Sequence, residues 1–83
     1  MTVKYCGTHE QFYEVLQRIS TYLHIRQVGS DFVRFDLDYH VVVHWWWETG
    51  TVLFQGPARA KMKLQAKFLK EAGSMATADL HAG

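Results

Sequence analysis

The side chains best suited to binding lie in one stretch, residues 39–56, with the sequence YHVVVHWWWETGTVLFQG. His40, His44 and Trp46 are spaced by four and two residues, so in an extended strand all three point to the same side. The two histidines cannot share a metal ion, because four residues of strand separate them by about 13 Å and no cysteine or carboxylate set completes the ligands. Exposed aromatic rings can instead stack on nucleic-acid bases or contact another protein.

Signatures of enzymes are absent from the sequence. It contains no phosphate-binding glycine loop, no nucleophile elbow and no paired acids at adjacent strand ends. Cys6 is the single cysteine, so an intramolecular disulfide and a cysteine-based zinc site are excluded. Cys6 lies in a short predicted strand between Tyr5 and Gly7, and we expect it to be a packed thiol rather than a nucleophile. We therefore predict a protein that is not an enzyme and has no catalytic residue, metal site or cofactor.

The stretch that carries these residues predicts a β-hairpin. β-branched and aromatic residues favour a strand over residues 39–47. Gly50 can adopt the positive φ of a tight turn, and alternation resumes over residues 51–55. Gly56 and Pro57 then end the second strand.

Side-chain alternation divides the hairpin into two faces. A two-residue loop at 49–50 pairs Trp47 with Val52 and Trp45 with Phe54. The face predicted to enter the core contains Tyr39, Val41, Val43, Trp45, Trp47, Val52 and Phe54. The opposite face contains His40, Val42, His44, Trp46, Thr51, Leu53 and Gln55. A slip of one residue would exchange the two faces.

The other segments predict three more strands and two helices. We expect strands over residues 2–6, 25–28 and 32–37, and helices over residues 9–23 and 58–72. Thr8 and Gln11 fit a capping box at the start of the first helix. Pro57 suits the first turn of the second helix, and Gly73 suits its end.

The order βαββββα predicts an α+β domain over residues 1–73. One antiparallel sheet of about five strands would bury one face beneath both helices and leave the other face open. In the strand over residues 32–37, Arg34 alternates with the apolar positions and so falls on the open face. Residues 74–83 lack periodicity and bulk, and we expect them to form a flexible tail.

Length and composition limit the class of protein. A chain of 83 residues, 48% hydrophobic, is enough for one modest core. No apolar run reaches the roughly 18–20 residues that a membrane span needs, and the N-terminus lacks a signal-peptide pattern. We therefore expect a cytoplasmic protein that does not enter a membrane.

Charge is distributed unevenly, although the formal net charge is only +1. One face of the second predicted helix carries a basic stripe, Arg59, Lys63, Lys67 and Lys70. Such a stripe could meet phosphates, or it could be plain solvated surface. The turns and the strand over residues 32–37 collect four acids, Asp31, Asp36, Asp38 and Glu48. This polarity suits docking to a charged partner or self-association.

The element order and the turn motif resemble a known family. Thr49-Gly50-Thr51 followed by Val-Leu-Phe-Gln-Gly, within a βαββββα order, resembles one repeat of the TATA-box-binding-protein fold, and most of all the N-terminal domain of type 3 bacterial ribonuclease H. The resemblance covers residues 2–72 and implies a nucleic-acid-binding open face without catalysis. The chain departs from the family in having a single repeat and no phenylalanine pair clearly placed to wedge between bases.

Two functions follow from these observations as expectations. The first is a non-enzymatic nucleic-acid-binding module that uses the open face and the basic helix. Its expected binding residues are Trp46, His44, His40, Leu53, Arg34, Arg59, Lys63, Lys67 and Lys70. The second is a small phage- or plasmid-type inhibitor that binds a protein of a nucleic-acid-handling defence complex. A homodimer through the open face is a further expectation.

Overall fold

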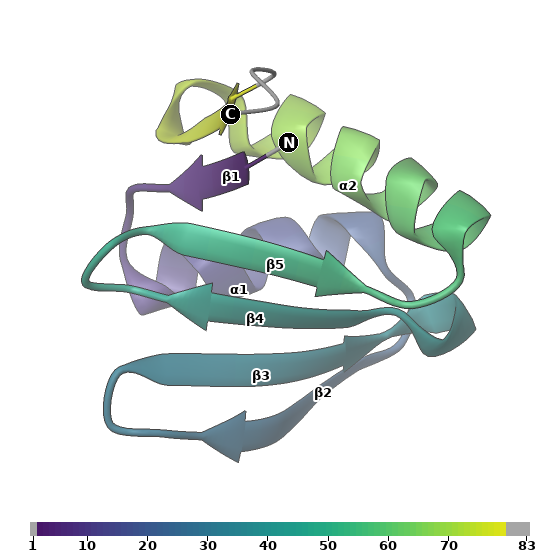
Figure 1. The fold of residues 1–83 in the computed structure, drawn as a ribbon, viewed down its shortest axis with the longest axis horizontal. Helices are drawn as coiled ribbons and strands as arrows, with labels where there is room; N and C mark the ends of the chain where they lie inside the picture. The colour runs from purple at the N-terminus through teal and green to yellow at the C-terminus, as the bar shows by residue number, and fades with distance from the viewer. Residues whose placement is uncertain (1, 80–83) are drawn as a thin grey trace.

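A computed structural model describes residues 2–79 and has an α+β fold, as the sequence predicted. A single antiparallel sheet has the strand order β2-β3-β4-β5-β1-β6, and two helices accompany it (Figure 1). The strands are β1 (Thr2–Tyr5), β2 (Leu23–Val28), β3 (Phe32–Leu37), β4 (Val42–Trp46), β5 (Thr51–Gln55) and β6 (Ala76–Asp79). The helices are α1 (His9–Ile19) and α2 (Ala58–Ala72), and short 3-10 turns occupy Asp38–His40 and Gly73–Met75. Neither α1 nor α2 is long and apolar enough to cross a membrane.

Both helices contribute to one core on the same face of the sheet, as expected. Phe12 of α1 stacks on Trp45 of β4 with ring centroids 4.3 Å apart. Phe68 of α2 meets Phe54 of β5 at 5.6 Å. Trp45 is 1% exposed, and the neighbouring Val43 is fully buried. The face chosen from alternation is therefore the buried one.

Helix α1 begins where the capping box predicts and ends earlier than the periodicity predicts. The amide of Gln11 donates to Oγ1 of Thr8 at 3.1 Å, and the amide of Thr8 donates to Oε1 of Gln11 at 2.9 Å. After Ile19 the chain turns, because the amides of Thr21 and Tyr22 donate to the Asp38 carboxylate at 2.8 and 2.9 Å. This turn frees residue 23 to start β2.

The start of the central hairpin differs from the prediction. Tyr39 and His40 have φ angles of 61° and 62° and lie in a 3-10 turn rather than a strand. Alternation requires an extended backbone, so two left-handed residues in succession remove both side chains from the predicted faces. Tyr39, expected in the core, is 67% exposed, and His40 is exposed outside β4.

The turn of the hairpin is also longer than predicted. Trp46 pairs with Thr51 and Trp45 pairs with Val52, which leaves residues 47–50 as the connection. This register differs from the predicted one by two positions, and an even shift leaves every side chain on its predicted face. Trp47 belongs to the connection and is half-buried against the core.

The expected tail differs from the structure over residues 74–79. Residues 76–79 form β6, which pairs antiparallel with β1 and matches Val3 with Ala78. The amide of Cys6 also donates to the carbonyl of Met75 at 2.7 Å. Small residues give β6 little side-chain pattern, and its backbone pairing with β1 supplies the hydrogen bonds. Residues 80–83 of the expected tail lie outside the described residues.

Gly56, between β5 and α2, lies close to the backbone of the 3-10 turn at residues 38–40, and a substitution can test this contact. Its φ is 139°, and a Cβ there would lie 2.8 Å from the carbonyl oxygen of His40. We expect Gly56→Ala to lower the free energy of unfolding. Backbone strain alone should cost about 1–3 kcal/mol, and the clash with the carbonyl oxygen should add to this loss. Gly73→Ala is the matched control, because Gly73 also has positive φ but no atom within 4 Å of the added carbon. Equal losses in urea denaturation would contradict a role for the contact with His40.

Candidate functional site

The sheet face opposite the helices is the candidate site. We call it the open face, and its residues on β3, β4 and β5 are Phe32, Arg34, Asp36, Val42, His44, Trp46, Thr51, Leu53 and Gln55. On β3 and β4 the open-face residues are half-buried and alternate with fully buried ones. Leu53 on β5 is 42% exposed. Among residues 2–79, neither helix contributes to this face.

Three rings on the open face form an aromatic cluster, Phe32, His44 and Trp46. His44 and Trp46 stack with centroids 5.5 Å apart and planes 18° apart. Phe32 lies 6.0 Å from each of them, because the β3–β4 register sets it directly opposite Trp46. The planes of the three rings differ by no more than 34°. The three rings are therefore nearly parallel, and the cluster is partly exposed to solvent.

Phe32 was not among the predicted binding residues, although His44 and Trp46 were. Alternation in the third strand does place Phe32 on the same side as Arg34 and Asp36. The missing information was the β3–β4 register, which depends on the conformation of the turn at residues 38–40.

Basic side chains flank the aromatic cluster on both sides. Arg34 pairs across the strands with His44, and Lys4 on β1 lies opposite Thr51, the neighbour of Trp46. Asp36 contacts two guanidinium groups, with its oxygens 2.8 Å from Nε of Arg26 and 3.6 Å from Nε of Arg34. One carboxylate beside two arginines leaves net positive charge here.

Of the four acids on the predicted acidic edge, Asp31 and Glu48 are exposed, and the other two are engaged within the domain. Asp36 is engaged by Arg26 and Arg34, and Asp38 holds the turn after α1. Burial raises the pKa of the Asp38 carboxyl, but hydrogen bonds from the amides of Thr21 and Tyr22 lower it more, with Ser20 and Lys67 adding to them. The net pKa lies below the usual value, so Asp38 remains ionised at neutral pH.

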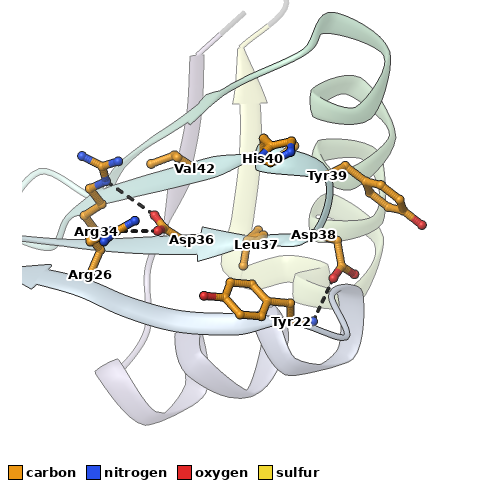
Figure 2. Close-up of a pocket in the computed structure, with 10 residues that line it drawn as sticks. Tyr22, Arg26, Arg34, Asp36, Leu37, Asp38, Tyr39, His40 and Val42 are labelled. Carbon is orange, nitrogen blue, oxygen red and sulfur yellow. Dashed lines mark hydrogen bonds and ion pairs between the residues drawn. The ribbon is translucent and has the colours of Figure 1, made fainter.

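A hollow of about 500 Å³ continues the open face beyond Arg34, towards the 3-10 turn (Figure 2). The Arg26–Asp36–Arg34 group lies at one end, and Tyr22 and Tyr39 lie at the other (Figure 2). His40, with Tyr39, is held at the rim by a left-handed backbone that costs of order 1–3 kcal/mol per residue. Guanidinium, phenol and imidazole groups are donors suited to phosphate and sugar oxygens.

The environment of His44 favours the neutral form of its imidazole ring. Burial lowers its pKa, and the charge of Arg34 lowers it further. Its Nδ1 is buried and has no hydrogen-bond partner among the described residues. Because the neutral form is favoured, His44 contributes an aromatic surface rather than a second positive charge.

The structure separates the predicted binding residues into three groups. His44, Trp46, Leu53 and Arg34 share the open face, and His40 lies apart from the strands, at the rim of the hollow. The basic stripe of Arg59, Lys63, Lys67 and Lys70 is exposed on α2, on the other side of the sheet. The stripe and the open face therefore do not form one continuous surface.

Residues suited to metal or nucleophile chemistry are not gathered into a site. Within residues 2–79, no group of three or more His, Cys, Asp or Glu side chains could hold a metal ion. Cys6 is exposed rather than packed as predicted, because β1 ends at Tyr5 and the chain leaves the sheet there.

The fold and the site together define a small α+β domain with one helix-covered sheet face and one open face. Comparisons with protein-family models, with curated proteins and with solved structures found no match to this chain. The resemblance to the TATA-box-binding-protein fold stays a prediction.

Proposed function

We propose that this protein is a non-enzymatic module that binds single-stranded nucleic acid on the open face of its sheet. The observation that carries the proposal is the aromatic cluster of Phe32, His44 and Trp46, flanked by Arg34 and Lys4. Aromatic side chains on an open sheet are a recurring platform for unpaired bases. Each stacked base contributes about 1–3 kcal/mol to the binding free energy, whichever of the bases it is.

The neighbouring groups complete this assignment. Bases stack on the aromatic cluster, and Leu53 extends its apolar surface across β5. Phosphates meet Arg34 and Arg26, and the hollow beside them accepts the backbone of the next nucleotide. The basic stripe on α2 faces away from the bound strand, so it accelerates the encounter through long-range attraction.

A protein partner is the second candidate function. The exposed Leu53 and half-buried Val42 give the open face apolar area that another protein could cover. This candidate corresponds to an inhibitor that docks on a protein of a nucleic-acid-handling defence complex. The two functions differ in salt dependence, since phosphate contacts release counterions and an aromatic protein interface does not.

Fluorescence anisotropy with labelled oligonucleotides tests the proposal. We expect single strands to bind better than a duplex of equal length, with affinity falling between about 50 and 200 mM salt. Arg34→Gln should reduce the log–log salt slope by about 0.7, the value for one phosphate contact on a single strand. The double change Lys63→Gln and Lys67→Gln is the matched control and should slow association with less effect on dissociation.

Two outcomes contradict the proposal. The first is no detectable affinity for any single strand, duplex or hybrid at about 50 mM salt, where phosphate contacts are strong. The second is a preference for duplex that the change at Arg34 leaves intact. Either result leaves the protein-partner function as the better explanation of the open face.

A further inference from the structure

A second hollow lies on the helix side of the sheet and is separate from the open face. It is a groove of about 450 Å³ between α1 and strands β2 and β3. This volume falls within the usual range of small-molecule sites. Its apolar floor includes Val33 and Phe35, and Val28 at its edge is 69% exposed on the outermost strand. The groove therefore exposes apolar surface that the two helices do not cover.

Aromatic rings in the groove stand at steep angles to one another. Trp45 and Trp47 are 6.4 Å apart with planes 69° apart, and His9 lies 4.8 Å from Trp47 at 59°. Tyr13 and Phe35 form a second pair, 6.2 Å apart at 50°. The groove is thus lined by aromatic rings inclined to one another, in contrast to the nearly parallel rings of the aromatic cluster on the open face.

Two carboxylates complete the lining of the groove, Glu10 and Glu14. They are one helical turn apart on α1, where two like charges destabilise a helix slightly. The helix dipole favours Glu10 in the first turn, but Glu14 lies beyond that turn. Neither forms an ion pair or side-chain hydrogen bond with another residue in the range 2–79, and no lysine or arginine lines the groove.

We propose that this groove binds a small amphipathic organic cation, an alkylated ammonium ion attached to an apolar body. The ammonium group faces the rings of Trp47 and Tyr13 beside the unpaired Glu14, and the apolar body lies on Val33 and Val28. Cations over aromatic faces are attracted by the ring quadrupole, and cages of such rings recognise quaternary ammonium groups. The proposal does not depend on nucleic-acid binding, because it uses the other side of the sheet.

Nitrogen–proton correlation spectra of the full chain, titrated with benzyltrimethylammonium, test this proposal. The three tryptophans give three indole signals. We expect saturable shifts of the Trp45 and Trp47 signals, with little change at Trp46 on the open face. The uncharged carbon isostere, 2,2-dimethylpropylbenzene, should bind at least about fivefold more weakly, which is the scale of one exposed cation–π contact.

Changes of charge supply the controls. Glu14→Gln should weaken binding of the cation by up to about fivefold, the scale of one exposed ion pair, and leave binding of the isostere unchanged. Glu71→Gln on α2 should alter neither. Both positions are exposed, so both variants should stay folded, with Glu14→Gln at most slightly more stable because it relieves the repulsion from Glu10. Equal binding of cation and isostere, an unchanged affinity in Glu14→Gln, or shifts confined to Trp46 would each overturn the proposal.

Discussion

Alanine in place of Trp45 is expected to leave the protein largely unfolded. Trp45 is 1% exposed and lies at the centre of the core, where it stacks on Phe12 at 4.3 Å and meets Tyr5 edge-on at 5.7 Å. Emptying a large buried aromatic site costs about 3–5 kcal/mol. A domain this small has a total stability near the lower end of the usual range, about 5 kcal/mol. The loss is therefore comparable with everything that holds the fold together.

Urea denaturation followed by circular dichroism measures this effect. Trp45→Phe is the matched control, because it keeps a ring against Phe12 and should lose less stability than the alanine variant. Trp46→Leu tests the opposite face of the same strand, where the side chain is only half-buried. An unchanged urea unfolding curve for Trp45→Ala would show that Trp45 is not in the core and that the buried and open faces of the sheet were assigned the wrong way round.

Alanine in place of Trp46 should cause the largest loss of nucleic-acid affinity. Trp46 contacts both other rings of the aromatic cluster, His44 at 5.5 Å and Phe32 at 6.0 Å. Its removal takes away one stacking surface, and Phe32 and His44 each lose a ring contact that positions them. At about 1–3 kcal/mol per stacked base, the dissociation constant for single strands should rise roughly 5- to 150-fold.

Two further variants at position 46 distinguish the effect of aromatic stacking from the effect of apolar side-chain volume. Trp46→Phe keeps an aromatic face and should lose less affinity than Trp46→Leu, which keeps apolar volume without a π system. Because Trp46 is half-buried, each variant needs its own unfolding curve before its affinity is compared. Wild-type affinity in a folded Trp46→Ala variant would contradict binding at the aromatic cluster, and so would equal affinities for the phenylalanine and leucine variants.

The sequence alone determined the features that depend on neighbouring residues. The capping box of Thr8 and Gln11 starts α1, and the spacing of Leu64 and Phe68 buries one side of α2. Alternation in residues 42–46 identified the buried and open faces, even though the predicted register was displaced by two positions. These features follow from periods of 3.6 and 2 residues, which are properties of the local chain.

Only the tertiary structure decided the features that depend on distant residues. The left-handed turn at Tyr39 and His40 and the strand at residues 76–79 have no local pattern, since one joins two paired strands and the other depends on pairing with β1. The β3–β4 register brings Phe32 to Trp46, and the approach of α1 to β3 sets Tyr13 beside Phe35. Both proposed binding surfaces arise in this way. Each joins side chains whose separation along the chain carries no periodic signal, so only the packing of the whole domain sets their distances.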